Sequence, residues 1–294
     1  MKYTLFTAAV CGLFAFTSCT EETNQLDSAP AAEDVSIDFI HDHEENGQTG
    51  LQDVPFADAL QAHAESTSED YFNAERSTVT RPDGTTEAVY TVGGDIELSK
   101  EELEKLRGMD DALLKQYRTF NTVSRRTIRV VGYTGGSNAL TSKMRTALRW
   151  AVNNYNALNI NKTFQLRFAS DTNGDIVVYR DPNNQGAGGV AGFPSGGNPY
   201  KWVRIYNGME QYNTNTNEHV MTHEIGHCMG LRHTDYATRQ SCNGSGEGSG
   251  SAGAVYIPGT PGGFDANSVM LACFGSNEDG EFGFYDRVAL EYMY

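Results

Sequence analysis

The chain has 294 residues, of which 39% are hydrophobic and 20% are charged, and its formal net charge is −16 at pH 7. This composition predicts a folded, loop-rich protein with one large domain or two small ones. It excludes nucleic acid as a partner, because the sequence has no basic stripe to meet phosphates.

Acidic residues are concentrated in the N-terminal part of the chain. Residues 19–120 contain 24 Asp and Glu against 7 Lys and Arg, a balance of −17, whereas residues 121–294 contain 14 of each. The remaining charge, Lys2, restores the total of −16. A chain divided in this way is expected to have two functional parts.

The first 18 residues are typical of a secretory signal, because Lys2 precedes an apolar run that is too short to span a bilayer. The run ends in Phe16-Thr17-Ser18-Cys19, which resembles a bacterial lipobox with Phe in place of the usual Leu. This resemblance implies lipidation of Cys19, and Glu21-Glu22 resembles the surface-export signal of some Gram-negative lipoproteins. We therefore expect a membrane anchor through Cys19 at the outer membrane or cell surface of a Gram-negative bacterium. The alternative is an ordinary cleaved signal and a secreted protein.

Residues 19–50 are polar and acidic and have few large apolar side chains, so they are predicted to be a disordered tether. His41 and His43 stand there beside acidic residues, and we interpret them as solvated side chains rather than metal ligands.

Residues 51–120 are predicted to form a small acidic module of mixed α and β structure. Apolar residues spaced by three and four predict helices at 55–66 and 99–120. The stretch 86–99 predicts strands.

From residue 121 onward the hydrophobic pattern is firmer. It predicts strands at 126–133, 163–170, 175–180 and 200–207, a thin glycine-rich strand and loop at 186–197, and helices at 141–158, 217–230 and 284–294. Thr141 is a suitable N-cap for the first helix, and Gly230 is a stop signal for the second. The first helix has one apolar face, formed by Met144, Leu148, Val152 and Tyr155.

The sequence DTNGD, residues 171–175, lies between two of these strands. Asp171 and Asp175 suggest a calcium loop, whereas Asn173-Gly174 between alternating strands is typical of a hairpin turn. We favour the hairpin.

Three cysteines remain after the signal, which itself contains Cys11. Cys228, Cys242 and Cys273 would lie in an oxidising compartment, and one disulfide with one buried thiol is the simplest outcome. Cys242–Cys273 is the first choice, since both follow the helix that carries His223.

The sequence HEIGHCMGLRH, which begins at His223, has the spacing of a metal site on a helix. His223 and His227 are four residues apart and share one helix face, where two imidazoles chelate one metal. Gly230 can adopt a positive φ and turn the chain, so that His233 supplies a third ligand. Three neutral imidazoles leave an open position on a tetrahedral zinc ion, and Glu224 can reach a water there.

A metal site accounts for this stretch better than a histidine-rich surface helix, which leaves the glycine without a role. His219 and His223 are also four apart, but that register leaves both the glutamate and the glycine without a role, so His219 is expected in a cleft or on the surface. Cys228 lies about 100° around the helix from His227, and buried packing is its expected role.

This stretch resembles the extended zinc signature H-E-x-x-H-x-x-G-x-x-H of the metzincin peptidases. NSVMLAC, residues 267–273, resembles their methionine turn, with Met270 as the methionine under the zinc. The details of both stretches are most similar to bacterial secreted metzincins of the dual-action metallopeptidase type. The order of predicted elements also fits, and the resemblance covers about 126–294.

The resemblance implies an α+β catalytic domain at 121–294. Such a domain has a twisted, mostly parallel sheet with an antiparallel edge strand and a long backing helix. The active-site helix, an irregular lower half and a C-terminal helix follow.

Two positions near the site depart from the metzincin pattern, and the role of a third has two possible interpretations. Ala272 stands where astacin-like and serralysin-like members have a tyrosine, so a tyrosine that stabilises the transition state must come from elsewhere or be absent. Thr234 fits none of the subfamily labels that rest on the residue after the third histidine. Asp235 is expected either to orient His233 as a hydrogen-bond acceptor or to have a surface or capping role.

Latency is the expected role of the acidic module. A blocking cysteine is excluded, because no cysteine lies between Cys19 and Cys228. VGGDIELS, residues 92–99, resembles the Phe-x-Gly-Asp stretch of astacins, which implies that Asp95 binds the zinc in place of water and that 51–120 is a pro-region. An ordinary glycine turn is the alternative. Arg125-Arg126 is a candidate processing site, although a basic pair at the start of a strand also explains it.

We therefore expect a zinc endopeptidase that acts on protein or peptide substrates, with Glu224 as the general base. The substrate is expected to lie extended along the edge strand near 188–194. Its specificity depends on residues 234–265, where the sequence has no interpretable pattern. One alternative is a non-catalytic surface-binding lipoprotein with a structural zinc, against which the intact Glu224 argues. Another is a metal-scavenging lipoprotein that uses the tether histidines and the helix.

Overall fold

The computed structural model describes residues 36–37, 74–105, 116–242, 246–247, 252–261 and 264–294. The predicted signal, Cys19, the two tether histidines and the predicted helix at 55–66 lie outside the described residues. Within the predicted tether, Ser36–Ile37 forms strand β1, which pairs antiparallel with β12 (Phe274–Gly275). Of the helices in the described ranges, none is long and apolar enough to cross a membrane.

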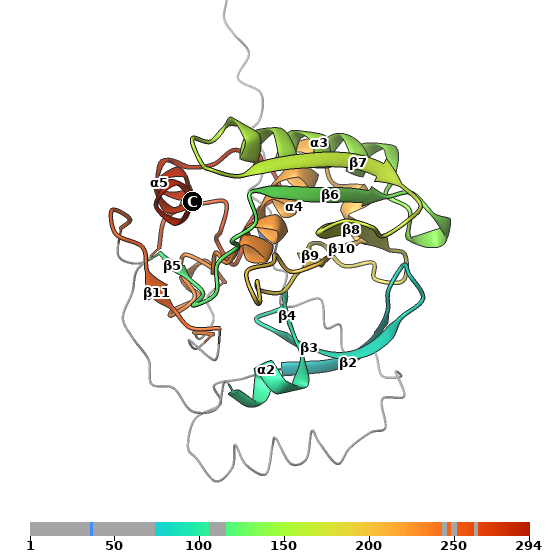
Figure 1. Ribbon diagram of the computed structural model, residues 1–294, viewed down its shortest axis with the longest axis horizontal. Helices are drawn as coiled ribbons and strands as arrows, with labels where there is room; N and C mark the ends of the chain where they lie inside the picture. Colours follow the sequence, from blue (N-terminus) through green and yellow to red (C-terminus); the bar gives the residue numbers. More distant parts are fainter. Residues whose placement is uncertain (1–35, 38–73, 106–115, 243–245, 248–251, 262–263) are drawn as a thin grey trace, which may run out of the picture. The chain divides into compact units, whose positions relative to one another are not determined.

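The central sheet has five strands in the order β7-β6-β8-β10-β9 (Figure 1). Its members are β6 (Thr127–Tyr133), β7 (Thr163–Ala169), β8 (Ile176–Asp181), β9 (Gly189–Val190) and β10 (Trp202–Tyr206). Four of them run parallel, and β9 runs antiparallel at one edge. The predicted strands and the thin edge strand are therefore confirmed.

The predicted hairpin between β7 and β8 is wrong. Both strands pair in parallel with β6, one on each side of it, so the chain crosses β6 instead of folding back beside β7. Asp171 pairs with Arg167 at 2.9 Å and Asp175 pairs with Arg129 at 2.9 Å, so the two carboxylates are not brought together for calcium either. The turn preference of Asn173-Gly174 is a local effect. The burial of apolar side chains of β7 and β8 on either side of β6 outweighs it.

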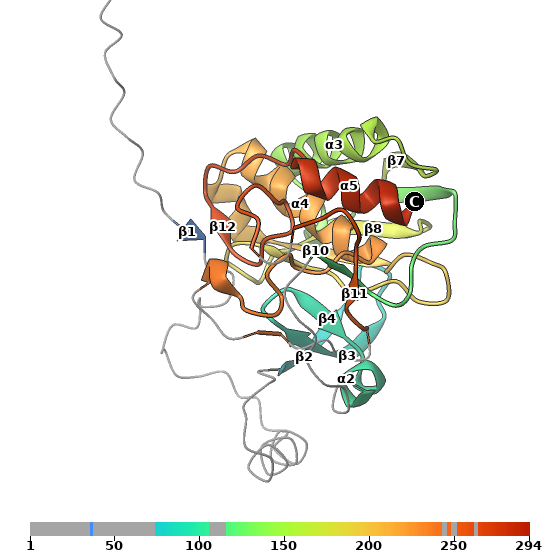
Figure 2. The ribbon, with the colours of Figure 1, turned by 90° about the vertical axis from the view of Figure 1, so that its left-hand side faces the viewer.

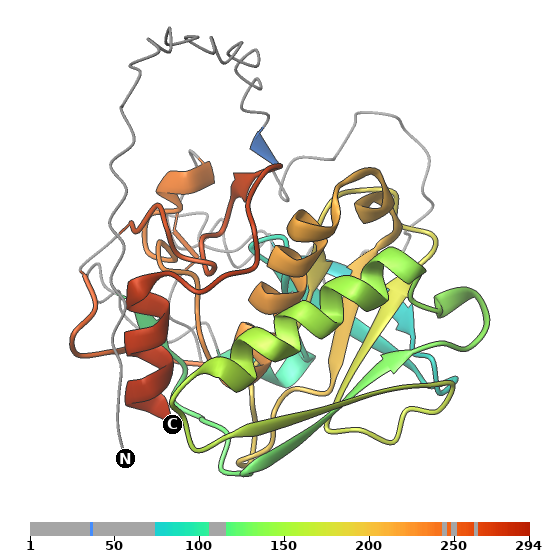
Figure 3. The same ribbon diagram turned by 90° about the horizontal axis from the view of Figure 1, so that it is seen from above.

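Helices α3 (Ser142–Ala157) and α4 (Thr214–Met229) cover the same face of the sheet (Figure 3). The Thr141 hydroxyl accepts a hydrogen bond from the Met144 N–H at 3.3 Å and caps α3, as predicted. The predicted apolar face of α3 is fully buried. It packs on β6, β8 and β10 through one continuous core that includes Val130, Val178 and Ile205.

Helix α4 begins three residues before its predicted start. The Asn213 side chain accepts from the Thr216 N–H at 2.8 Å and supplies the N-cap. Nearly every residue of α4 from Thr216 on is buried, because the helix lies between α3, the sheet and the irregular lower half (Figure 2). A helix that is buried on all sides has no single apolar face. The spacing of apolar residues therefore predicted the start of α4 less accurately than the start of α3.

The acidic module packs against the opposite face of the sheet and its β9 edge. It contains β2 (Ala74–Thr80), β3 (Thr86–Val92), β4 (Ile96–Leu98) and the short helix α2 (Lys100–Lys105). Arg81, in the turn between β2 and β3, donates to the Tyr179 hydroxyl at 3.0 Å and lies over the Trp202 ring. The strands predicted within 86–99 are confirmed, and β2 is a further strand.

The predicted helix at 99–120 is correct only for α2. Tyr117–Arg118 instead forms strand β5, which pairs with β11 (Val255–Tyr256), and residues 106–115 lie outside the described ranges. Tyr117 is buried, and its carbonyl accepts from the Arg232 N–H at 3.0 Å. Tertiary pairing thus overrides the helical spacing, and this segment pairs with residues of the domain expected at 121–294.

The lower half of the domain expected at 121–294 is irregular, as the resemblance implied. The predicted disulfide Cys242–Cys273 is present, and Cys228 is a buried free thiol as expected. Helix α5 (Phe284–Met293) closes the chain where a helix was predicted. Short 3-10 helices lie at Gly136–Asn138, Asn207–Gln211 and Gln240–Cys242.

Candidate active site

Helix α4 presents two of the predicted ligands, and the turn after it presents the third. His223 and His227 lie one turn apart on α4. Gly230 ends the helix with φ of 100°, and its N–H bonds back to the carbonyls of Gly226 and His227. A side chain at this positive φ is strained, so the glycine is what allows the chain to turn and bring His233 back to the helix.

Each imidazole is fixed in one tautomer by an oxygen that can only accept a proton. The Nδ1 atoms donate in turn to the carbonyl of Val269 (from His223, 2.8 Å), the carbonyl of Leu231 (from His227, 2.9 Å) and the carboxylate of Glu247 (from His233). The proton therefore sits on Nδ1, and the lone pair of each ring sits on Nε2.

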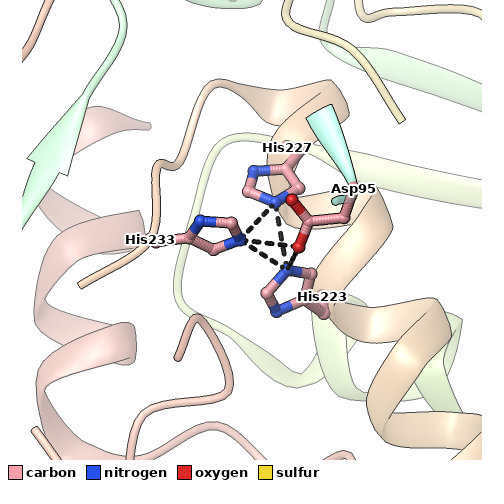
Figure 4. Close-up of side chains that lie close together, drawn as sticks. All are labelled: Asp95, His223, His227 and His233. Carbon is pink, nitrogen blue, oxygen red and sulfur yellow. Dashed lines mark hydrogen bonds and ion pairs between the residues drawn. The ribbon is translucent and has the colours of Figure 1, made fainter. Parts of the chain in front are cut away.

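The three Nε2 atoms converge on one point (Figure 4). Their separations are 3.0 Å between His223 and His227, 3.1 Å between His223 and His233, and 3.2 Å between His227 and His233. Three lone pairs cannot hydrogen-bond to one another, whereas a cation satisfies all three. Four-coordinate zinc with bonds of about 2.0–2.1 Å separates its ligand nitrogens by about 3.3–3.4 Å, so these residues fit such an ion.

Asp95 occupies the fourth corner of this cluster (Figure 4). Its Oδ2 lies 2.9 Å from Nε2 of His233 and 3.5 Å from Nε2 of His223. Burial alone would raise the pKa of Asp95, but the imidazoles, His233 above all, hold it well below its usual value. The structure therefore brings together the three predicted ligands and the predicted switch residue.

The segment that carries Asp95 also pairs with the edge of the sheet. The N–H of Ala191, just beyond β9, donates to the Asp95 carbonyl at 3.0 Å, and the Ala191 carbonyl accepts from the Glu97 N–H at 2.8 Å. This pairing is parallel. Residues 95–97, called the Asp95 segment below, thus lie along the edge where an extended substrate was expected.

Glu247 is a site residue that the sequence did not reveal. Its buried carboxylate accepts the His233 Nδ1 proton and also pairs with Arg239 and, at 3.7 Å, with Arg232. The carboxylates of Asp95 and Glu247 on its two sides make the His233 ring more basic, and a more basic imidazole is a stronger ligand for a cation. Glu247 lies in a glycine- and serine-rich stretch, where spacing gives no signal of its role.

Asp235 does not orient His233. Its carboxylate instead accepts from the Ser241 N–H at 2.9 Å, the Ser241 hydroxyl at 2.6 Å and the Ala272 N–H at 3.2 Å. It joins the loop after the third histidine to the methionine turn, and because Asp235 is buried, the surface position expected as the alternative is wrong as well.

Glu224 is buried beside the histidines, and its Oε2 has no hydrogen-bond partner among the described residues. Burial first, and then the neighbouring Asp95 carboxylate, raise the pKa of Glu224 well above its usual value. A buried carboxylate oxygen that has no partner among the described residues, beside the corner that Asp95 occupies here, has the chemistry to accept a proton from water once that corner is free.

Met270 lies directly under α4. A Cβ on Gly226 would be 2.5 Å from the Met270 sulfur, so the glycine of the HEIGH sequence makes room for the methionine. The turn is held by the buried Asp286, which accepts from the Ser268 hydroxyl at 2.6 Å and the Val269 N–H at 2.9 Å. The carbonyl of Val269 also accepts the hydrogen bond from Nδ1 of His223, so α5 and the turn together fix the orientation of this metal ligand.

His219 is buried and stands outside the metal cluster. Its Nδ1 bonds to the Asp279 carbonyl at 2.6 Å, and burial lowers its pKa to about 3. It lines a cavity rather than the surface, which decides between the two positions expected for it.

The mostly parallel sheet, the two helices on one face and this cluster define a metallopeptidase with a metzincin-like catalytic domain. The sequence matches the family of dual-action HEIGH metallo-peptidases over residues 89–294, and the chain belongs to this family.

Two solved structures of myroilysin are similar to the chain. One shares 18% identity over 59% of this chain and 96% of its own, with a TM-score of 0.38. The other shares 15% identity over 67% of this chain and 98% of its own, with a TM-score of 0.36. Among curated proteins, no match is found.

Proposed function

We propose that the protein is a secreted or surface-anchored zinc endopeptidase that is made as a latent zymogen. The observation that carries the proposal is the convergence of three Nε2 atoms within 3.2 Å of one another, beside an oxygen of Glu224 that has no hydrogen-bond partner in the described part of the chain. Imidazole nitrogens with one open position are the donor set of catalytic zinc.

His223, His227 and His233 would hold the zinc. When bound, the metal supplies Lewis acidity, which polarises the scissile carbonyl and lowers the pKa of the attacking water. Glu224 takes a proton from that water and delivers it to the leaving amine as the C–N bond breaks. The Nδ1 hydrogen bonds keep the rings in the ligand tautomer throughout, so the histidines themselves exchange no proton.

Latency is assigned to the Asp95 segment, which would block the site in two ways. The Asp95 carboxylate takes the corner that water needs. The backbone of the segment takes the N–H and C=O of Ala191, which an extended substrate needs. Activation then requires the acidic module to leave the edge of the sheet.

A buried ion-pair network anchors the same segment. The Glu97 carboxylate is bound by Arg81 of the acidic module and, from the catalytic domain, by the Tyr200 hydroxyl at 2.6 Å and Arg204 at 3.4 Å. Arg81 and Glu97 are almost fully buried. Breaking a buried pair by removing one partner is costly, so this network favours the latent arrangement.

The cellular location belongs to the same proposal. The sequence around Cys19 supports lipidation and anchoring at the outer membrane or cell surface, which would expose the peptidase to extracellular proteins. Radiolabelled palmitate incorporation that depends on Cys19 would test the anchor.

The activity is tested with the purified 19–294 chain, zinc and casein. We expect one zinc per chain, cleavage of casein after activation, and loss of cleavage with a chelator. Glu224→Gln should lower hydrolysis by about 10²–10⁴-fold and leave the zinc content unchanged, because Gln keeps the shape but accepts no proton.

The outcomes separate the alternatives. A stoichiometric zinc without any proteolysis would favour a structural metal in a surface-binding protein. Several metals per chain would favour scavenging. Full activity in Glu224→Gln would remove Glu224 from its role as the base.

A further inference from the structure

The Glu97 carboxylate occupies a site that the catalytic domain builds only in part. From that domain, the Tyr200 hydroxyl donates to Oε1 at 2.6 Å, and Nη2 of Arg204 lies 3.4 Å from Oε2. The acidic module supplies the other cation, Arg81, which pairs with Oε1. The side chains of Glu97 and Arg204 are both largely buried. Two of the three groups that bind this carboxylate therefore belong to the part of the chain that performs the proposed catalysis.

This site lies close to the metal cluster along the edge of the sheet. Glu97 follows Asp95 by two residues in the Asp95 segment, and both residues bond to the backbone of Ala191. A Cβ on Gly192 would be 2.7 Å from the Glu97 carbonyl oxygen and 2.8 Å from the Tyr200 ring, so the glycine leaves space for an extended chain here. An extended substrate that bonds to Ala191 in place of the segment would bring one of its side chains to the position of Glu97.

Departure of the acidic module would leave the catalytic-domain half of this site without its anion. Arg81 and Glu97 belong to the same module, so they leave together. The Tyr200 hydroxyl and Arg204 remain, with Asp181 of β8 at 3.4 Å from Arg204 on its other side. Nε of Arg204 is buried and has no partner among the described residues even with Glu97 in place. A guanidinium group and a hydroxyl that already bind one carboxylate have the chemistry to bind another.

We propose that Arg204 and Tyr200 form a subsite for a glutamate or aspartate side chain of the substrate, within three residues of the scissile bond, and that Glu97 mimics this side chain in the latent chain. The substrate carboxylate accepts from the Tyr200 hydroxyl and pairs with Arg204, as Glu97 does here. The inference rests on the proposed peptidase function for its biological meaning, but its first test requires no activity.

The first test is whether the site binds a carboxylate that is not part of the chain. Glu97→Ala in the full-length protein removes the atoms that acetate can replace. The Kd values of acetate and of neutral acetamide follow from the rise of the thermal midpoint with their concentration. The wild-type chain, in which Glu97 fills the site, corrects for general effects of each additive. We expect acetate to bind at least about tenfold more tightly than acetamide, and equal affinities would overturn the proposal.

Further substitutions in the Glu97→Ala chain identify the cation that binds acetate. Arg204→Gln and Arg81→Gln each remove a buried cation that has already lost the Glu97 carboxylate, so both chains are expected to fold. Arg204→Gln should lower the preference for acetate by about tenfold. Arg149→Gln, which removes an exposed cation on α3, is the control and should leave the preference unchanged. A preference that survives Arg204→Gln and depends on Arg81 alone would place the site in the acidic module and refute the subsite.

The second test is cleavage of a peptide set by the full-length chain with Asp95→Ala and Glu97→Ala, which together free the metal corner and the subsite. The peptides carry Glu, Gln or Lys at one of three positions on either side of a fixed bond. At one position, kcat/KM for Glu should exceed that for Gln by about tenfold or more, and Arg204→Gln but not Arg149→Gln should remove this preference.

The results of the peptide set separate the subsite from the activity. Cleavage without a preference for Glu at any position would refute the subsite and leave the peptidase function in place. A set that is not cleaved at all would refute the peptidase function, and the acetate titration would still decide whether Arg204 and Tyr200 form a carboxylate site.

Discussion

The Asp95 carboxylate lies 2.9 Å from Nε2 of His233, although 138 positions separate the two residues in the sequence (233 − 95). The same segment pairs its backbone with Ala191 at the edge of the sheet. One short stretch of the acidic module thus contacts both the metal ligands and the edge strand, and its removal is expected to free both together.

Replacing Asp95 by Ala should activate the full-length chain. The substitution removes the fourth ligand but leaves the backbone pairing of residues 95–97, so peptidase activity should rise by about 10- to 100-fold rather than to the level of a processed enzyme. Cleavage of a fluorogenic peptide, measured before and after processing, checks this. Asp83→Asn, in an exposed turn of the same module, is the control, and equal activity in both variants would show that Asp95 is not the switch.

Replacing Glu247 by Gln should weaken metal binding. Gln can still accept the hydrogen bond from Nδ1 of His233. It lacks the negative charge that makes the imidazole a stronger ligand, so zinc affinity should fall by about 10–100-fold. Competition with a chromophoric chelator measures it. Asp235→Asn should lower thermal stability without a comparable loss of zinc affinity, because Asp235 bonds to Ser241 and Ala272 and not to the ring. The assignment of Glu247 would be wrong if the two variants exchanged these effects.

Replacing Gly226 by Ala should destabilise the protein, even though Ala is the better helix former by about 1 kcal/mol. The added Cβ would be 2.5 Å from the Met270 sulfur, and overpacking of this kind costs about 1–3 kcal/mol of the free energy of unfolding. Urea denaturation measures the loss. Met270→Ala in the same chain should recover part of it, so that the two changes cost less together than their sum. Strict additivity would mean that the contact is not what requires the glycine.

The stability of the protein should fall between about pH 4.5 and pH 7 because of Glu218. Burial raises the pKa of Glu218 to about 7 from its ordinary value of 4.5, so in this window the folded chain keeps a proton that the unfolded chain has lost. The free energy of unfolding therefore decreases as pH rises through the window, by about 1–3 kcal/mol. Glu218→Gln should flatten this part of the profile, because the amide does not titrate and still accepts from Asn154, which bonds to Glu218 at 2.9 Å.

Denaturation midpoints at several pH values give that profile. Glu291→Gln is the matched control, since it removes an exposed carboxylate on α5. A profile that keeps its slope in Glu218→Gln would assign the pH dependence to another group.

The elements predicted from the sequence were those whose signal is local. The apolar face of α3 repeats at helical spacing, and Thr141 caps it, so that helix was predicted to within a residue at each end. The hairpin predicted at Asn173-Gly174 was wrong, because the turn preference of these two residues does not determine which strand pairs with β7. The helix predicted over Tyr117–Arg118 was wrong for the same reason, because this segment pairs with β11, which lies far along the chain.

The sequence by itself determined where the three histidines, Glu224 and the turn at Gly230 lie relative to one another, because that arrangement follows from the geometry of one helix and the residues just after it. It also pointed to Asp95 through the resemblance of residues 92–99 to a stretch of astacins, and to the Cys242–Cys273 pair because both cysteines follow the helix that carries His223. Only the tertiary structure decided that Glu247 rather than Asp235 holds His233, that Gly226 makes room for Met270, and that His219 faces a cavity. Each of these depends on segments that are distant in sequence or lie in irregular loops, where no periodic pattern relates one side chain to the other.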